Sequence, residues 1–270
     1  EAKRSEAAER LFRWLRLNQW IATHTVGWIP VTIYDKTQWN PEGCKDWREA
    51  VQLLRGKKCF GGGDLSKSTD LTALTLLFPP QDGLDKWVAL FTGWIPLDDI
   101  EARERADHAP YRDWIRAGFI HGCPGDVIDY EDVIDTILQA VETYDLRIIG
   151  FDPWLSTTIT QRLASLIAGA GKSTQIVEIP QGMKSISPPM KEMEHLIRTH
   201  EMLHVHNTAA RQCFANVRCD TDSNENIHPN KKRSRGRIDI TVSWIIAFAT
   251  SKLEPKPTLA DAVTGGKWHL

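Results

Sequence analysis

Long apolar runs are missing from this 270-residue sequence. None approaches the roughly 20 consecutive apolar residues that a helix needs to cross a bilayer, and no secretory signal pattern is visible. We therefore expect no membrane among the partners of this chain. Hydrophobic residues make up 41% and charged residues 25%, which is typical of a globular domain with a buried core.

The cysteine spacing of a disulfide scaffold or a zinc ribbon is missing as well. The five cysteines are an odd number, and no two stand at the short separations that those sites use: Cys44, Cys59, Cys123, Cys213 and Cys219. We therefore expect the chain to work in a reducing compartment, where structural disulfides are rare.

The sequence has no excess of charge of one sign. Its 33 Lys and Arg residues nearly balance its 35 Asp and Glu residues, and the net charge is −2. Any basic surface that binds nucleic acid must therefore be local. One segment, residues 231–237, is rich in basic side chains and is either a solvated loop or a loop that contacts phosphates: Lys231, Lys232, Arg233, Arg235 and Arg237.

A complete P-loop for nucleotide binding is also missing. The segment Gly169-Ala170-Gly171-Lys172-Ser173-Thr174 resembles the end of one, but Leu166 stands where the motif needs its first glycine. The segment also follows a predicted helix instead of a strand. We interpret Gly169 or Gly171 as the C-cap of that helix, so an ATP-binding domain is the weakest of the alternatives.

The patterns that are present predict a mixed α/β domain. Three strand-like runs with short connections come first and indicate an antiparallel meander: residues 57–64, 71–78 and 87–94. Helical and strand patterns then alternate, with helices over 130–144, 156–168, 189–199 and 238–252 and strands over 146–151 and 176–179. Such an order predicts a mixed sheet with helices on both faces.

The ends of the chain have patterns of their own. Residues 5–20 have the periodicity of an amphipathic helix, and we interpret 1–55 as a helix plus an extended arm. Because the chain starts at Glu1 and this arm resembles the end of a preceding domain or linker, we expect an excised domain. The main domain covers 56–254, and the tail 255–270 is expected to be loosely ordered.

Three aspartates occupy positions where ligands often bind. Asp64 ends the first strand behind three glycines, Asp152 follows the strand 146–151, and Asp239 lies in the first turn of the last helix. Each has an ordinary alternative: a turn, a helix cap, or a charge that complements the helix dipole. Together at one sheet edge they would repel one another without a cation. Their oxygen atoms suit Mg²⁺ or Mn²⁺, and two such ions would support phosphodiester hydrolysis.

Several short motifs resemble one known family in their order and spacing. They are Gly62-Gly63-Asp64-Leu65-Ser66, Asp70-Leu71-Thr72-Ala73-Leu74, Ile149-Gly150-Phe151-Asp152-Pro153-Trp154, Gln181-Gly182-Met183 and Arg237-Ile238-Asp239. This series resembles the nuclease domain of tailed-bacteriophage large terminases, which has an RNase H-like fold. The last motif departs from the family, because relatives often have Gly where this chain has Ile240.

The resemblance implies an endonuclease that cuts concatemeric double-stranded viral DNA during genome packaging. It implies two divalent ions, with Asp64 bridging them, Asp152 and Asp239 each helping to hold one, and Asp70 in support. The implied partners are double-stranded DNA, the ATPase domain of the same full-length protein, the portal and the small terminase subunit, in the host cytoplasm at the procapsid. Two alternatives stay open: another RNase H-like nuclease such as a junction resolvase, and a non-catalytic DNA- or portal-binding module.

Overall fold

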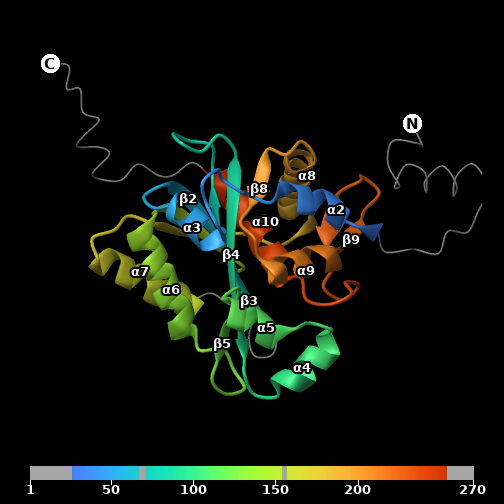
Figure 1. Cartoon of the computed structure of the whole chain (residues 1–270), viewed down its shortest axis with the longest axis horizontal. Helices are drawn as coiled ribbons and strands as arrows, with labels where there is room; N and C mark the ends of the chain where they lie inside the picture. Colours follow the sequence, from blue (N-terminus) through green and yellow to red (C-terminus); the bar gives the residue numbers. More distant parts are fainter. Residues whose placement is uncertain (1–25, 67–70, 154–156, 254–270) are drawn as a thin grey trace, which may run out of the picture.

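A mixed sheet crosses the centre of the molecule, with helices packed on both of its faces (Figure 1). The computed structural model describes residues 26–66, 71–153 and 157–253, without the side chains of Val26, Thr157 and Thr158. The strand order in this seven-stranded sheet is β5-β4-β3-β2-β6-β7, and β8 pairs with another stretch of β4. A second, three-stranded sheet with the order β1-β9-β10 lies to one side.

The centre of the main sheet is the predicted antiparallel meander. It consists of β2 (Lys58–Asp64), β3 (Thr72–Phe78) and β4 (Trp87–Pro96). The strand β2 pairs antiparallel with β3, and β3 pairs antiparallel with β4 over seven residues. Most residues of these strands are buried, because helices cover the sheet on both sides.

Parallel strands extend the meander at both edges. On the β2 side lie β6 (Asp145–Phe151) and β7 (Gln175–Glu178), and on the β4 side lie β5 (His121–Cys123) and β8 (Met202–His204). All four run parallel to their neighbours. The combination of an antiparallel meander with parallel strands confirms the predicted fold class.

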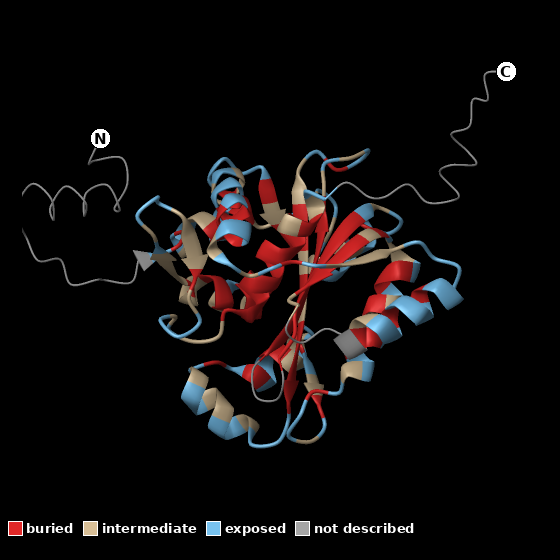
Figure 2. Cartoon of the chain, turned by 180° about the vertical axis from the view of Figure 1, so that it is seen from behind, coloured by how far each residue is buried: buried red, intermediate tan, exposed pale blue. Residues whose placement is uncertain are grey.

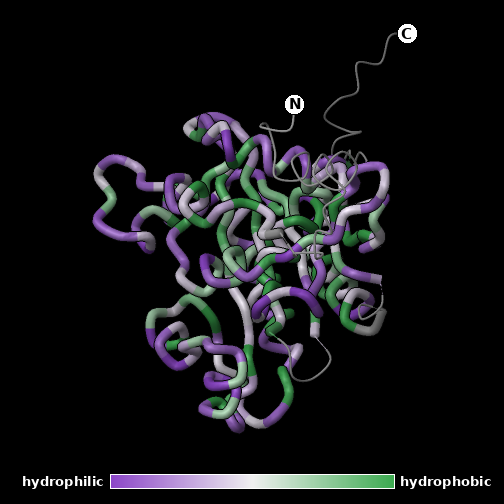
Figure 3. The backbone as a smooth tube through the Cα atoms, turned by 90° about the vertical axis from the view of Figure 1, so that its right-hand side faces the viewer, coloured by the Kyte–Doolittle hydropathy of each residue, from purple (hydrophilic) through white to green (hydrophobic). Residues whose placement is uncertain are grey.

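Two groups of helices form two hydrophobic cores, one on each face of the sheet (Figure 1). One face is covered by α6 (Tyr130–Thr143) and α7 (Thr157–Gly169), and the other by α8 (Met183–Arg198), α9 (Thr208–Asn216) and α10 (Asp239–Ser251). Buried residues are concentrated in the sheet and in the helix surfaces that face it (Figure 2), and hydrophilic loops lie at the periphery (Figure 3). None of the described helices is long and apolar enough to span a membrane.

The helix α10 packs directly against β2, and glycine makes this close approach possible. A Cβ atom at Gly62 would lie 2.2 Å from the backbone nitrogen of Ala247 and 2.4 Å from the carbonyl oxygen of Ser243. The Ser243 hydroxyl also lies 2.7 Å from the Thr75 hydroxyl of β3. Gly62 therefore allows the backbone of α10 to lie directly on the strand that ends at Asp64.

Within residues 26–55, short helices interrupt the segment that was predicted to be an extended arm. It contains the short strand β1 (Val26–Gly27) and three helical turns or helices: α2 (Val31–Tyr34), η1 (Asp35–Thr37) and α3 (Trp47–Gln52). Tyr34 is buried and its ring stacks on His204, with 3.9 Å between ring centroids. The Asp46 side chain caps α3 by accepting from the backbone nitrogens of Arg48 and Glu49.

Further differences concern helix ends and short elements. The helix predicted over 189–199 begins earlier, at Met183, and contains Pro188 and Pro189. Sequence patterns did not predict α4 (Ile100–Asp107), α5 (Tyr111–Ala117), β9 (Arg218–Thr221) or β10 (Ile227–Pro229). As predicted, a glycine ends α7, since Gly171 follows the helix with a positive φ of 69°. The predicted helix 5–20 and tail 255–270 lie outside the described residues.

Candidate active site

Two of the three predicted carboxylates meet at one end of the sheet. Asp64 is the last residue of β2, and Asp239 is the first residue of α10. Both are buried, with 4% and 2% of their surface exposed. The close packing of α10 on β2 through Gly62 explains why the first turn of the helix lies beside the end of the strand.

The ammonium group of Lys231 lies between these two carboxylates. Its Nζ donates to Asp64 Oδ2 and to Asp239 Oδ1, at 2.8 Å in both cases. Both oxygens therefore lie within twice that distance of each other. About half of the Lys231 side chain is exposed, so it reaches the buried pair from the surface. A cation thus occupies the point at which the two carboxylates meet.

The surroundings shift the pKa values of both Asp64 and Lys231. Burial, together with the negative charges of Asp239 and Asp152, raises the pKa of Asp64 to about 7, although Lys231 acts in the opposite direction. Burial lowers the pKa of Lys231, but the two carboxylates outweigh it and raise that pKa above its usual value. Lys231 therefore remains charged, and the Asp64 carboxyl keeps its proton to a higher pH than an exposed aspartate does.

The third carboxylate, Asp152, lies at the end of the neighbouring strand. Gly63 of β2 pairs in parallel register with Phe151 of β6, so Asp64 and Asp152 each follow one member of this pair. The charge of Asp152 contributes to the raised pKa of Asp64. Within the described part of the chain, however, no three His, Cys, Asp or Glu side chains are grouped as a metal site. Two carboxylates therefore converge on Lys231, and the third stands nearby.

This donor set fits a hard divalent cation. Carboxylate oxygens are the ligands that Mg²⁺ and Mn²⁺ prefer, and one cationic group, the Lys231 ammonium, already lies between Asp64 and Asp239. The residues that could hold a metal are therefore Asp64 and Asp239, with Asp152 at the adjacent strand end. Asp70, the predicted supporting residue, lies outside the described residues, and its role stays a prediction.

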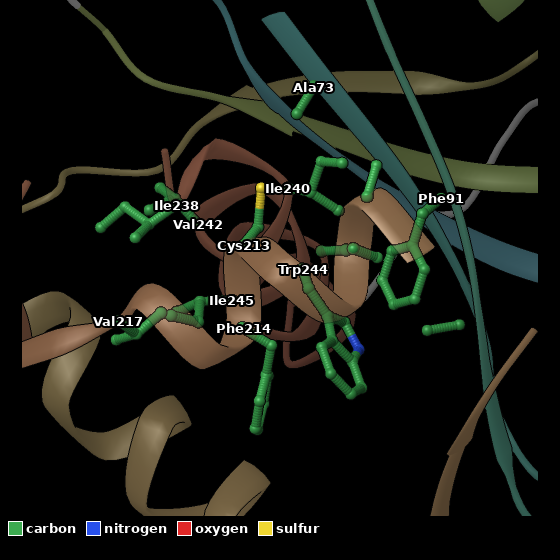
Figure 4. Packing of buried hydrophobic residues seen from close by; sticks show 14 of the residues in the cluster. Ala73, Phe91, Cys213, Phe214, Val217, Ile238, Ile240, Val242, Trp244 and Ile245 are labelled. Atoms are coloured by element: carbon green, nitrogen blue, oxygen red, sulfur yellow. The ribbon is translucent and has the colours of Figure 1, made fainter. Parts of the chain in front are cut away.

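The first turn of α10 rests on a packed apolar base. Ile238 and Ile240, which flank Asp239, belong to the same buried cluster as Cys213 and Val242 (Figure 4). Burial, followed by the charge of Asp239, raises the pKa of the Cys213 thiol, so the thiol remains neutral beneath the site. This apolar base fixes the position of the Asp239 backbone.

The basic residues of 231–237 do not share one environment. Lys231 enters the carboxylate site, Arg233 forms an ion pair with Asp220 at 2.9 Å, and Arg237 forms one with Asp107 at 3.0 Å. Lys232 and Arg235 are exposed. Contact of this loop with DNA stays a prediction, and the geometry favours Lys232 and Arg235 as the residues that would make it.

The hairpin of β9 and β10 fixes the loop that carries Lys231. Asn230 Nδ2 donates to Asp220 Oδ2 at 2.6 Å, and the Ser234 hydroxyl donates to the Asn230 carbonyl at 2.8 Å. The backbone nitrogen of Arg218 donates in turn to the Ser234 hydroxyl. The backbone around Lys231 is therefore held by its own hydrogen bonds, independently of the contacts of the Lys231 side chain.

His204, the last residue of β8, has a structural role. His204 is buried between Tyr34 and Phe91, and its ring nitrogens lie 3.1 Å and 3.2 Å from the carbonyl oxygens of Tyr34 and Val205. Burial lowers the pKa of His204 to about 4, so the ring is neutral at physiological pH. His204 is therefore part of the packed core that joins Tyr34 to the main sheet.

The fold and the acidic strand ends define the class of protein. An antiparallel meander continued by a parallel strand, with acidic residues at the ends of adjacent strands β2 and β6, is the RNase H-like arrangement of terminase nuclease domains. The family model of the terminase large subunit, endonuclease domain, matches residues 12–254. The chain belongs to this family, which confirms the resemblance that the sequence motifs predicted.

Individual relatives agree with this assignment. The chain is 28% identical over 254 residues to the terminase large subunit of Enterobacteria phage HK97, covering 94% of this chain and 47% of the relative. It is 22% identical over 271 residues to the protein YmfN of Escherichia coli K12, covering 97% and 56%. The crystal structure of the HK97 large terminase superimposes with a TM-score of 0.70 at 27% identity, over 92% of this chain and 48% of that one. The chain thus spans about half the length of these relatives.

Proposed function

We propose that this domain is a metal-dependent endonuclease that cleaves concatemeric double-stranded viral DNA during genome packaging. The observation that supports the proposal most strongly is the buried pair of Asp64 and Asp239, whose carboxylates both contact the ammonium group of Lys231. Two buried carboxylates in contact are costly unless a cation neutralises them. Membership of the terminase endonuclease family supports a role for such a site in phosphodiester hydrolysis.

The three aspartates have distinct roles in this proposal. Asp64, Asp239 and Asp152 would hold two Mg²⁺ or Mn²⁺ ions, with Asp64 contributing to both and the other two each helping to hold one. When bound, two such ions activate water and stabilise the leaving oxygen of a phosphodiester. The carboxylates would position these ions, and the burial of Asp64 and Asp239 keeps bulk water away from the charges that would hold them.

The protein surface around the site would position the DNA. The exposed Lys232 and Arg235 lie on the same loop as Lys231 and would contact phosphates without reading bases. Arg233 and Arg237 would act mainly through their ion pairs with Asp220 and Asp107, which shape the loop.

The partners follow from the family and are part of the proposal. Because the chain spans about half of its relatives, we propose that an ATPase domain belongs to the same full-length protein. Such a protein would work with the portal and the small terminase subunit, at the procapsid in the host cytoplasm.

A plasmid digestion with Mn²⁺ tests the proposed activity. We expect the wild-type domain to nick and linearise plasmid DNA and to stop when EDTA is added. The variants Asp64→Asn and Asp239→Asn should lose about 100-fold or more of this activity, because each removes a charged metal ligand. The matched control is Asp113→Asn, which makes the same change at an exposed residue paired with Arg116 on α5 and should cleave like the wild type.

The same assay separates the proposal from its alternatives. Equal cleavage by wild type, Asp64→Asn and Asp239→Asn would place the active site elsewhere. Cleavage of a four-way junction but not of linear duplex would indicate a junction resolvase. Binding of duplex DNA without cleavage at any Mn²⁺ concentration would indicate a non-catalytic DNA-binding module.

A further inference from the structure

Lys231 has an unusual position for a residue of a surface loop. Its side chain is about half exposed, yet its ammonium group contacts two side chains that are only 6% and 3% exposed, those of Asp64 and Asp239. Both contacts are 2.8 Å long. These contacts give Lys231 a role distinct from that of its exposed neighbours in the loop.

The conformation of the loop backbone does not depend on the contacts of the Lys231 side chain. Asn230 and Arg233 on either side are both tied to Asp220, at 2.6 Å and 2.9 Å. The Arg233 backbone nitrogen also donates to Asn230 Oδ1 at 3.1 Å. The long, flexible Lys231 side chain can therefore leave the carboxylates while these hydrogen bonds of the loop stay in place.

The ammonium group and a metal ion would compete for the same atoms. Lys231 uses Asp64 Oδ2 and Asp239 Oδ1, which are the two oxygens that converge in this site. A Mg²⁺ ion lies about 2.1 Å from each oxygen ligand. An ammonium group bonded to the same two oxygens would then lie within a few ångströms of a divalent charge, where repulsion is strong and poorly screened.

We propose that Lys231 is a built-in counter-cation, which neutralises the carboxylate pair in the metal-free protein and leaves it when a divalent ion binds. This inference rests on the proposed function, because it takes Asp64 and Asp239 to be metal ligands. It adds that metal binding must overcome the ion pairs of Lys231, so this residue lowers the affinity of the free domain for metal. The position of the Lys231 side chain then depends on whether a divalent ion is bound at the site.

The wild-type protein allows a direct test by amine acylation and mass spectrometry, with Lys232 as the internal reference. In EDTA, Lys231 should react about tenfold or more slowly than Lys232, because its ammonium group is held in two charge-assisted hydrogen bonds. Saturating Mn²⁺ should remove most of this protection without changing the reactivity of Lys232. If Lys231 stays equally protected while Mn²⁺ is bound, or is not protected in EDTA, the proposal is wrong.

A pair of variants tests the same point through metal affinity. Lys231→Met keeps much of the apolar stem but removes the charge, and Lys232→Met makes the same change one residue away at an exposed position. Calorimetric titration with Mn²⁺ at pH 8 without DNA, corrected for the protons that Asp64 releases, should show about tenfold tighter binding for Lys231→Met, since the two ion pairs of Lys231 no longer compete. Lys232→Met should stay within about twofold of the wild type, because long-range charge effects are screened. Equal or weaker binding by Lys231→Met overturns the proposal.

Further outcomes separate this inference from the proposed function. If Mn²⁺ releases Lys231 but the domain cuts no DNA, the counter-cation stands and the nuclease proposal fails. If Mn²⁺ supports cleavage that depends on Asp64 while Lys231 stays protected, the nuclease proposal stands and the counter-cation fails. If Mn²⁺ does not bind, or binds equally to wild type and Asp64→Asn, the metal site fails and both proposals fall.

Discussion

At the scale of single residues, the chemistry of the site depends on how charges are arranged around Asp64. This carboxylate is buried, and its pKa is raised to about 7 by burial and by the nearby acidic charges. The positive charge of Lys231 offsets these negative charges, and its two ion pairs hold Asp64 and Asp239 together. The residues that neutralise this site therefore decide whether it is stable without metal.

The basic loop leads to a prediction that separates neighbouring residues. Lys232→Ala and Arg235→Ala should each weaken duplex binding and reduce the slope of log affinity against log salt by about 1, because each removes one phosphate contact. Arg233→Ala and Arg237→Ala should change the slope less, since these side chains are paired with Asp220 and Asp107. Fluorescence anisotropy over a salt series in EDTA measures this difference. Equal slopes for all four variants would contradict the distinction between the exposed and the ion-paired basic residues of the loop.

Sequence patterns could predict only part of this site. Asp64 and Asp152 were predictable because each follows an apolar strand, and neighbouring parallel strands end at the same sheet edge. Lys231 was predicted as one of five similar basic residues. Its actual place depends on the path of a loop set by Asn230, Asp220 and Ser234, which no periodicity encodes.

At the scale of elements, the contact between α10 and β2 brings the two aspartates together. Gly62→Ala should therefore lower the free energy of unfolding by about 3 kcal/mol, because the new Cβ meets backbone atoms that cannot rotate away. The clash would be with Ala247 and Ser243 in the middle of α10. Urea denaturation followed by circular dichroism measures this loss.

Gly169→Ala is the matched control for this substitution. Nothing lies within 4 Å of a Cβ built at Gly169, the last residue of α7. Alanine is favoured over glycine in helices, so this variant should be as stable as the wild type or more stable. Similar losses in both variants would show that the contact between α10 and β2 is looser than described.

Whether an element could be predicted depended on its length and burial. The long elements α6 and α10 were predictable because apolar residues recur at helical spacing or fill the segment. Strands β8 and β10 have three residues each, too few to show alternation, and α4 has no buried residue. The start of α8 was hidden by Pro188 and Pro189, which normally end helices.

At the scale of the whole molecule, His204 joins the N-terminal segment to the main sheet. Burial lowers its pKa to about 4, whereas an unfolded chain has a pKa near 6.5 at this residue. Between these values the unfolded state binds more protons, so stability falls as the pH falls from 6.5 to 4. The expected loss is about 3 kcal/mol, and urea denaturation across this pH range measures it.

Replacement of the histidine tests this origin of acid sensitivity. His204→Gln should be less stable at pH 7 but should lose less stability between pH 6.5 and 4 than the wild type. His195→Gln, which changes an exposed residue on α8, should keep the wild-type dependence on pH. An unchanged slope in His204→Gln would mean that other groups cause the acid sensitivity.

The architecture as a whole places one acidic end of the sheet beside one basic loop. The strand ends of β2 and β6 supply Asp64 and Asp152, α10 supplies Asp239, and the loop after β10 supplies Lys231. Strand order in the mixed sheet places Asp64 beside Asp152, and the packing of α10 on β2 and the loop after β10 bring in Asp239 and Lys231. We propose that this meeting point is the metal site of a nuclease.

Anomalous diffraction from crystals soaked in Mn²⁺ tests that claim most directly. We expect two peaks about 4 Å apart, one near Asp64 and Asp239 and one near Asp64 and Asp152, with the Lys231 ammonium withdrawn from the pair. Peaks found only at other carboxylates, with Lys231 still bridging Asp64 and Asp239, would contradict the account.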